Sequence, residues 1–234
     1  MHITKLLTLI ALLFTSSTMA IEPQTFTFVF ILTGPATNIE LQAQQDAFKG
    51  HFSNMSRMAG DGDLLIAGPY WQPQTWDDMR GMWIFNTDEI DQASELAASD
   101  PPGKLGIFVF DILQFKTDDA LHELPRLERE DEERRLADPD VPDEWAGRGY
   151  FWASAEVSSS EEPDRVHGVA LLGTLVGNED SRIHADHWLL LLDATTIEDA
   201  RNVLIDAGCD PKLWNIDEWY GSAMPAKLPS FRDD

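Results

Sequence analysis

The order of two hydrophobic periodicities along residues 25–115 is the strongest constraint on the fold of this chain. Residues 25–33 (TFTFVFILT) carry aromatic and β-branched side chains on both faces, which is typical of a central strand. From about 39 to 59, apolar side chains recur every three or four positions, which predicts a helix that ends at the glycine turn 60–62. A short strand is expected to follow over 64–67.

Three more elements complete this first half of the chain. Residues 82–85 (MWIF) predict a third strand, and an apolar face with helical spacing follows between 88 and 98. The sequence Asp-Pro-Pro-Gly at 100–103 ends that helix, and 107–115 alternates as a fourth strand. The order β-α-β-β-α-β is the ferredoxin-like arrangement, with two helices on one face of an antiparallel sheet. Because the other face is apolar and has no helix, we expect it to pack against a second sheet.

The pattern starts again, in weaker form, over residues 149–222. Strand-like segments recur at 150–157, 166–172, 188–193 and 214–220, a helix opens at 195–200, and 174–178 echoes 65–69. We infer an internal duplication, whose degenerate second copy supplies the missing sheet but has no counterpart of the helix at 39–59. The predicted fold class is therefore α+β, with two tandem ferredoxin-like βαββαβ copies.

Three segments lie outside the two halves, which we place at 25–117 and 149–222. Residues 1–20 have the composition of a signal peptide. Residues 118–148 are predicted to form a charged, acidic, solvated linker with helical character. The proline-rich tail at 223–234 is expected to be loose.

The first twenty residues predict export. Lys5 precedes the apolar run LLTLIALLF at 6–14, and small residues stand at 18 and 20, as in secretory signal peptides. We place the cleavage after Ala20 and expect a periplasmic or secreted protein; the alternative is an uncleaved N-terminal anchor. No later apolar run approaches the length of a transmembrane helix, so no membrane contact is expected after cleavage.

The composition restricts the partners of the chain. The formal net charge is −24, with 41 acidic and 17 basic side chains. Such a surface repels nucleic acid and anionic membranes, because phosphate binding needs lysine and arginine. Cys209 is the only cysteine, so the fold has no internal disulfide. Its neighbours Gly208 and Asp210 do not favour a thiolate, and we interpret Cys209 as a small packed side chain rather than a nucleophile.

His51 is the first candidate for chemistry. The helical spacing places it on the apolar side of the predicted helix at 39–59. An imidazole titrates near neutral pH and can take up and return a proton, so a histidine on such a face can serve as a general acid or base. The alternative is a buried histidine whose hydrogen bond closes the end of the helix.

Short motifs of the first half resemble the YCII-related (YciI-like) family. The matching segments follow one another in the family's order and spacing over about ninety residues. They are Gly50-His51-Phe52, GDLLIAGP at 62–69, AASDP at 97–101 and GIF at 106–108. The most specific part is the histidine followed at this distance by the strand that ends in Gly-Pro. The second half resembles the family only as a degenerate relative.

This resemblance implies a dimeric α/β barrel, which two chains usually form and which the two copies would form here within one chain. The site proposed for the family is a His-Asp pair that corresponds to His51 and Asp100, with the carboxylate orienting the imidazole. One branch is similar to enzymes that eliminate HCl from chlorinated aromatic rings, and the wider fold includes lactone isomerases and cofactor-poor oxygenases. We therefore expect a small-molecule site with acid/base chemistry of the elimination or isomerisation type. The alternative is a non-catalytic ligand-binding or structural module that keeps the fold without activity.

Aromatic residues after the second strand are candidates for ligand contacts. Tyr70, Trp71 and Trp76 follow Gly68-Pro69, which would place these five residues near the mouth of a cavity beside the histidine. The alternative is that the aromatic rings cap the core or the contact between the two copies.

The remaining motifs predict no cofactor or metal. His184 and His187 flank an acid, but no further cysteine or histidine cluster completes a ligand set, so we interpret both as surface histidines. The sequon at Asn54 lies inside a predicted helix and is discounted. We expect a small-molecule ligand as the partner and a monomer with an internal pseudo-dimer; a homodimer is left open.

Overall fold

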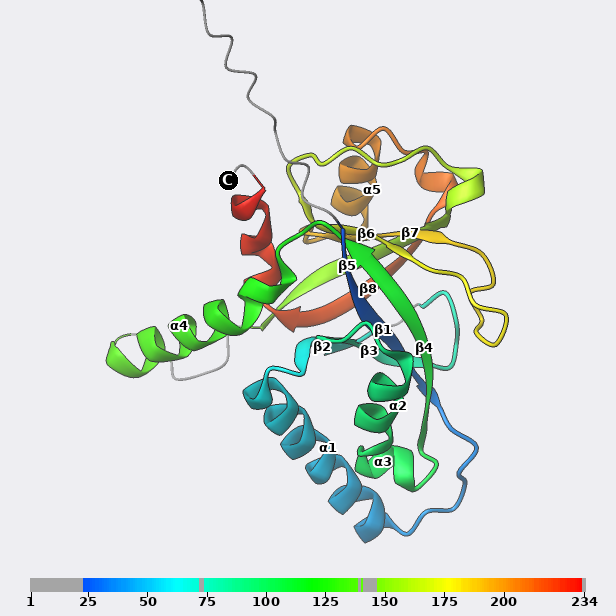
Figure 1. Cartoon of the computed structure of the whole chain (residues 1–234), viewed down its shortest axis with the longest axis vertical. Helices are drawn as coiled ribbons and strands as arrows, with labels where there is room; N and C mark the ends of the chain where they lie inside the picture. The colour runs from blue at the N-terminus through cyan, green and yellow to red at the C-terminus, as the bar shows by residue number, and fades with distance from the viewer. Residues whose placement is uncertain (1–22, 72–73, 139, 141–146, 233–234) are drawn as a thin grey trace, which may run out of the picture.

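The computed structural model describes residues 23–71, 74–138, 140 and 147–232. Over these residues the chain has an α+β fold, in which eight antiparallel strands form one sheet that closes almost completely into a barrel with helices outside it (Figure 1). The predicted signal peptide, and the part of the predicted linker at 139 and 141–146, lie outside the described residues. No helix in the described ranges is long and apolar enough to cross a membrane.

The predicted order of elements over 25–115 is confirmed, with ends that differ by a few residues. The first half contains β1 (Gln24–Thr33), α1 (Leu41–Asp61), β2 (Leu64–Pro69), β3 (Met79–Phe85), α2 (Ile90–Ala98), α3 (Pro101–Lys104) and β4 (Phe108–Thr117). The segment expected only to end α2 also forms the short helix α3, with Asp100 as its N-cap residue. Proline in the first turn suits this helix start, because its missing N–H would have no helical partner there.

Helices of the predicted linker come next, followed by the four strands of the second half and a C-terminal helix. This part of the chain contains η1 (Leu121–Glu123), α4 (Leu124–Ala137), β5 (Gly147–Glu156), η2 (Val157–Ser159), β6 (Val169–Leu175), β7 (His187–Leu192), α5 (Ile197–Asp206), η3 (Pro211–Leu213), β8 (Asn215–Ser222) and η4 (Met224–Phe231). Between β5 and β6 only the single turn η2 is helical, so the expectation that this segment has no counterpart of the helix at 39–59 is confirmed.

The strands follow the order β2-β3-β1-β4-β6-β7-β5-β8 around the barrel. One seam joins the halves where β4 pairs with β6, through Phe115 opposite Leu175. At the other seam β2 lies beside β8, and an isolated bridge links Tyr70 to Trp219. The sheet therefore has almost no open edge, which removes the unpaired backbone groups that promote aggregation.

The barrel interior is the main core of the protein. Alternate residues of β1, among them Phe26, Phe28 and Phe30, point inward and are buried there together with Trp152 and Trp219 from the second half. The Phe28 and Trp152 rings meet edge to face at 5.8 Å between centroids. The helix-free face of the first sheet is thus covered by the second group of strands, as its apolar character predicted.

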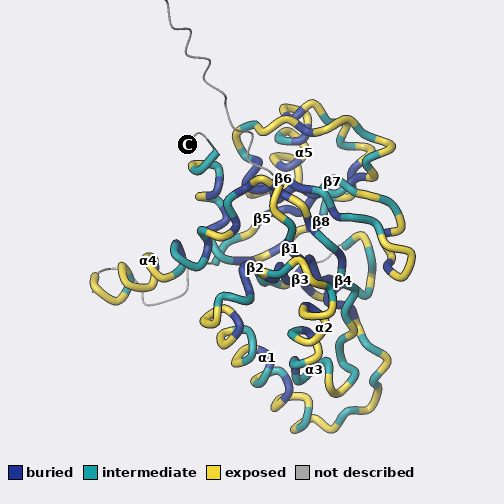
Figure 2. The backbone as a smooth tube through the Cα atoms, in the orientation of Figure 1, coloured by how far each residue is buried: buried dark blue, intermediate teal, exposed yellow. Residues whose placement is uncertain are grey.

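Helices cover the outer faces of the sheet. Val29, Ile31 and Trp83 point outward and form a second buried cluster with residues of α1 and α2, among them Met58 and Ala97. On the second half, α5 covers a third cluster that contains Phe151 and Leu190. Figure 2 shows the buried residues concentrated in the strands and the exposed residues on the outer sides of these helices.

Two glycines allow close approach of strands at the two seams. A Cβ atom on Gly68 of β2 would collide with the Tyr220 carbonyl oxygen of β8. A Cβ atom on Gly173 of β6 would lie 2.5 Å from the Lys116 carbonyl oxygen of β4. Because real Cβ contacts are longer than this, a side chain at either position would force the backbone at that seam apart.

We predict that Gly68→Ala lowers the free energy of unfolding by at least about 2 kcal/mol, because the methyl group must displace the backbone of β8. Gly60→Ala is the matched control, since a Cβ atom at Gly60 in α1 would meet nothing within 4 Å. There alanine should be neutral or stabilise by up to about 1 kcal/mol, as it favours the helix. Urea unfolding followed by circular dichroism measures both; equal effects would contradict the close contact at the seam.

The C-terminal segment is ordered, which corrects the expectation of a loose tail for residues 224–231. Its helix η4 buries Met224 and Leu228 against the barrel core, beside Leu121 and Leu124 at the start of the predicted linker. The linker prediction is therefore incomplete, because its first residues belong to the core. Further on, α4 extends from the barrel as expected for a charged helix, with Pro125 in its first turn (Figure 1).

A buried carboxylate holds these segments in place. Asp119 is 2% exposed and accepts hydrogen bonds from Arg165 at 2.8 Å and from Arg232 at 2.7 Å. It also accepts one from the Leu172 backbone N–H at 2.8 Å. This network ties the end of β4, the 157–168 segment and the C-terminal helix to one another.

We predict that Asp119→Ala destabilises the protein by about 3 to 5 kcal/mol, because it leaves two arginines without their buried partner. Asp118→Ala is the control, since Asp118 pairs with the same Arg165 but is exposed. Its loss should change the free energy of unfolding by less than about 1 kcal/mol. Chemical denaturation compares the two variants, and similar losses would rule out a special role of the buried carboxylate.

Candidate functional site

His51 and Asp100, the two predicted catalytic residues, are in direct contact. His51 lies on the inner side of α1 and Asp100 at the start of α3, with 2.8 Å between Nδ1 and Oδ1. The histidine is 8% exposed and the aspartate is fully buried. With the carboxylate oxygen as acceptor, Nδ1 donates in this bond, and Nε2 is the ring nitrogen left for a ligand. No described protein group pairs with Nε2.

The residue before the histidine explains how this contact forms. A Cβ atom on Gly50 would lie 2.8 Å from Cγ of Pro101, so glycine is needed for α1 to pack this closely on α3. The imidazole is then held between aromatic rings: its centroid lies 5.7 Å from Trp83, nearly parallel, and 5.7 Å from Phe108. The family-like sequence Gly-His therefore has a packing reason at its first position.

Asp210 in the second half occupies a position similar to that of Asp100, but its carboxylate is used differently. Asp210 begins η3 as Asp100 begins α3, and both precede a proline. Asp210 accepts from the Lys212 backbone N–H and so caps its helix, whereas Asp100 makes no capping hydrogen bond. Oδ1 of Asp100 accepts from His51, while Oδ2 is buried and has no partner among the described residues. The carboxylate therefore relies on the imidazole for its hydrogen bonding among the described residues.

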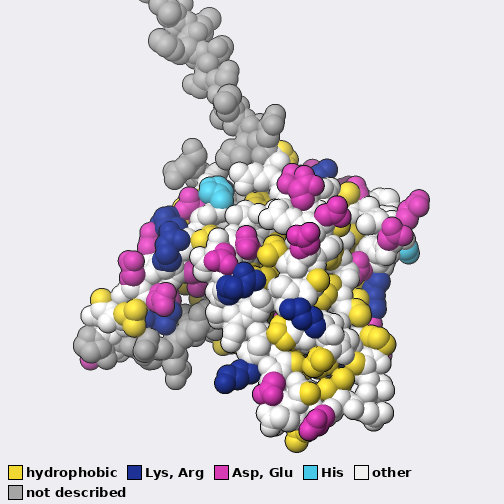
Figure 3. Space-filling view, turned by 60° about the horizontal axis from the view of Figure 1, so that its bottom comes forward, with side chains coloured by type: hydrophobic (Ala, Val, Ile, Leu, Met, Phe, Trp, Pro, Cys, Tyr) yellow, Lys and Arg dark blue, Asp and Glu magenta, His cyan; other side chains and the backbone are white. Residues whose placement is uncertain are grey.

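A cavity of about 420 Å³ opens beside the histidine. Its walls come from α1, from the ends of β1, β2 and β3, and from the turn before β4. The lining residues are Ile31, Thr33, Phe48, His51, Phe52, Met55, Gly68, Pro69, Arg80, Gly81, Trp83, Ile107 and Phe108. Most are apolar or aromatic, and among the described residues that line it none carries a carboxylate. Hydrophobic side chains also gather on the end of the molecule that carries α1, α2 and α3 (Figure 3).

The predicted ligand contacts are only partly at this cavity. Gly68 and Pro69 line it, but Tyr70, Trp71 and Trp76 are not among the lining residues. Tyr70 is buried in the barrel interior, where burial raises the pKa of its hydroxyl. The backbone N–H of Trp71 donates to the Glu218 carbonyl at 2.8 Å, and the Trp71 side chain is largely exposed.

Trp76, the third predicted aromatic contact, also lies away from the cavity. The ring of Trp76 lies 5.2 Å from Phe30 and closes the barrel core. Nearby, the backbone N–H and hydroxyl of Thr75 donate to Asp217 of β8 at 2.6 and 2.8 Å. Tyr70 and Trp76 thus pack on the core near the seam with β8, as in the alternative interpretation, whereas Trp71 does not.

The other candidates have no site around them. His184 is exposed, and Nδ1 of His187 donates to the Ala185 carbonyl at 2.8 Å. Within the described residues, no group of three histidine, cysteine or acidic side chains is arranged to hold a metal ion. Burial, with a smaller effect of the Asp164 charge, raises the pKa of Cys209 to about 11, which opposes formation of a thiolate.

We predict that Cys209 reacts with a disulfide reagent such as DTNB at least about tenfold more slowly in the native protein than in urea, because little thiolate forms at pH 8. Unfolding exposes the thiol and restores its ordinary pKa. Absorbance at the reagent's thiolate band measures both rates. Equal rates would contradict the interpretation of Cys209 as a packed side chain.

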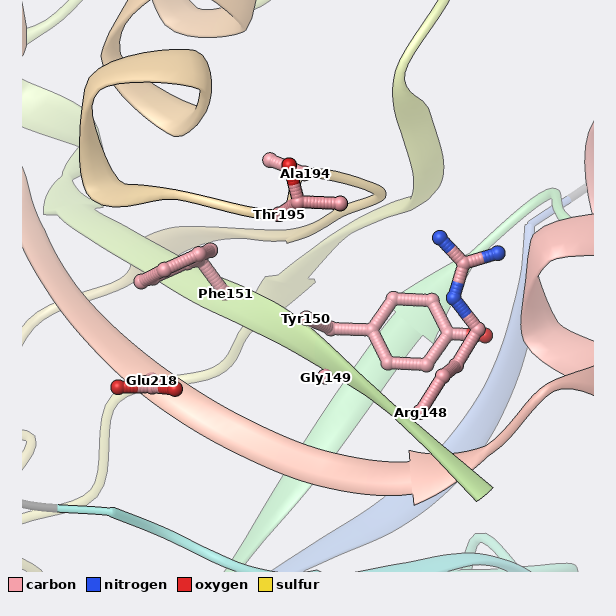
Figure 4. Close-up of a pocket in the computed structure, with 7 residues that line it drawn as sticks. All are labelled: Arg148, Gly149, Tyr150, Phe151, Ala194, Thr195 and Glu218. Atoms are coloured by element: carbon pink, nitrogen blue, oxygen red, sulfur yellow. The ribbon is translucent and has the colours of Figure 1, made fainter. Parts of the chain in front are cut away.

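A smaller cavity of about 190 Å³, lined by residues of β5 and β8 and by the turn after β7, was not anticipated from the sequence (Figure 4). The Arg148 guanidinium lies 4.9 Å from the centre of the Tyr150 ring and pairs with Asp193. Its charge is thus already compensated by the protein. No motif marks these residues, because the pocket forms only where separate strands meet.

The chain has no recognisable relative in three comparisons: no family model, no curated protein and no solved structure matches it significantly. The function is therefore argued from the geometry of the site.

Proposed function

We propose that the cavity beside His51 binds a small molecule and that His51 acts on it as a general acid or base. The observation that carries this proposal is the fixed orientation of the imidazole. Asp100 occupies Nδ1 from a fully buried position, which leaves Nε2 as the nitrogen available at a largely apolar cavity. A titratable group at an apolar cavity, oriented by a carboxylate, is the arrangement that proton transfer requires.

The chemistry that follows is proton transfer coupled to elimination or isomerisation. In an isomerisation, Nε2 would accept a proton from an acidic carbon of the ligand and return it to another atom. In an elimination, the electron pair of that C–H bond would form a C=C bond while the leaving group departs with its own bonding pair, and the proton would pass from Nε2 to solvent. Asp100 would keep Nδ1 protonated and stabilise the imidazolium that forms. No serine or cysteine stands among the described lining residues, and the hydroxyl of the one threonine, Thr33, donates to the Asp78 carbonyl rather than to a base, so an acyl-enzyme mechanism is not proposed.

A second candidate is a module that binds a ligand, or only maintains the fold, without chemistry. The buried pair also joins α1 to α3, which is a structural role in itself. The second half has no helix equivalent to α1 and hence no second histidine in this position. One site at most is expected per chain.

We further propose that the chain is an exported, monomeric member of the YCII-like fold, built from two ferredoxin-like copies. Three features support the duplication. Each half has the same strand order, and each has an irregular pairing at the same place, after Leu64 and after Val169. The seam glycines are also equivalent, so that Gly173, and not Gly177 as the sequence echo suggested, corresponds to Gly68. The signal-like sequence at 1–20 supports export.

The test is hydrogen exchange at carbon, which needs no knowledge of the natural substrate. We expect the protein to catalyse the exchange of acidic C–H groups in D₂O for a panel of small aromatic acids, lactones and ketones, followed by proton NMR. His51→Ala should reduce the exchange rate by about 100-fold or more, because the proton acceptor is lost. Asp100→Asn should also reduce it, because an amide does not enforce the same tautomer.

Stability measurements separate catalysis from a structural role. His51→Ala should destabilise the protein by stranding the buried charge of Asp100, and the double variant His51→Ala/Asp100→Asn should recover part of that loss. If the double variant is folded and binds ligands but lacks exchange, His51 is catalytic. Ligand binding by the wild type without exchange of any compound would instead favour the non-catalytic module.

A further inference from the structure

Arg80, an exposed residue, lines the same cavity as His51. It lies in β3, and its Nη1 donates to the carbonyl oxygens of Met79 at 2.9 Å and Asp77 at 3.2 Å. These two bonds hold one side of the guanidinium on the protein and leave its other N–H groups for a ligand.

The charge of Arg80 has no carboxylate partner among the described residues. The nearest acid in the sequence, Asp78, is bound by both terminal nitrogens of Arg182, with 2.7 Å from Nη1 to Oδ1. The hydrogen bonds from Arg182 are the largest cause that holds the pKa of Asp78 below its ordinary value, and the nearby charge of Arg80 adds to it. Asp78 therefore acts on Arg80 only through space, because its carboxylate oxygens are bound by Arg182.

The residues around Arg80 in the cavity indicate the charge of the ligand. Acidic side chains outnumber basic ones by 41 to 17 in the chain, yet none of the described residues that line this cavity is acidic. A positively charged wall repels cationic ligands and favours an anion. The remaining walls are aromatic or aliphatic side chains, which include Phe48, Phe52 and Phe108. These surfaces suit a planar apolar body.

We propose that the ligand of this site is a small aromatic or otherwise planar carboxylate, whose carboxylate binds Arg80 while its ring lies between the aromatic walls and faces Nε2 of His51. This inference rests on the proposed small-molecule site and names its ligand class. One guanidinium matches one carboxylate through paired N–H···O bonds. A phosphate would need several more donors, and the described lining residues provide no second cation except His51. A volume of about 420 Å³ suits a ligand of one or two rings.

The experiment compares acids with amides of the same shape. Benzoate and 2-naphthoate are titrated against benzamide and 2-naphthamide, with affinities from calorimetry. The ring-proton signal of His51, assigned by its loss in His51→Ala, reports binding at this site. We expect each acid to bind the wild type at least about fivefold more tightly than its amide, because a charge-assisted bond replaces a neutral one. Arg80→Gln should bring this ratio close to one.

Lys49→Ala is the matched control, because Lys49 is an exposed cation on α1 that does not line the cavity. It should leave the acid-to-amide ratio unchanged. Equal binding of acid and amide to the wild type would overturn the proposal. The proposal would also fail if the acid-to-amide affinity ratio of Arg80→Gln stayed at the wild-type value, or if Lys49→Ala lowered that ratio as much as Arg80→Gln does. Failure of both acids to bind would overturn it as well.

The amides distinguish this failure from that of the proposed function. If the amides shift the His51 signal and the acids hold no advantage, the cavity is a small-molecule site and only the carboxylate inference fails. If neither acids nor amides shift the His51 signal, the small-molecule site fails together with the inference.

Discussion

The mutual burial of two apolar sheet faces holds this protein together. In each four-stranded group the outer face is covered by helices, and the inner face is covered mainly by the other group. The large rings of β1 and β5, with Phe28 against Trp152, fill the barrel where the two groups meet. Because the hydrophobic free energy scales with the area removed from water, this interior supplies most of the stabilisation, and no disulfide contributes.

The candidate site depends on that barrel without being part of its interior. Closure at the seam of β2 and β8 requires Gly68, and the same strand end forms one wall of the cavity. The outer face of the sheet supports α1, whose Gly50 permits contact with Pro101 and so brings His51 to Asp100. A buried pair on the outer layer of a rigid sheet is held in one geometry, which is the condition for acid/base chemistry.

The distribution of charge separates this site from the rest of the surface. The chain is strongly acidic, and several arginines are engaged by neighbouring carboxylates, as Arg182 is by Asp78 and Arg165 by Asp119. Arg80 faces a cavity that acidic side chains avoid. Its guanidinium is a positive charge at this cavity within a negative protein, and such a charge favours anionic ligands.

The sequence alone determined the order of the strands and helices and the need for a second sheet. It also identified His51 as a candidate acid or base, because periodicity and the chemistry of a side chain are local properties. The contact of His51 with Asp100 followed only from a resemblance until the packing of Gly50 on Pro101 gave it a physical basis. Tertiary structure decided the rest. It placed Trp76 and Tyr70 in the core, ordered the C-terminal helix through Asp119, and brought Arg80 to the cavity. These outcomes depend on which strands become neighbours when the barrel closes, and no local pattern in the sequence specifies that closure.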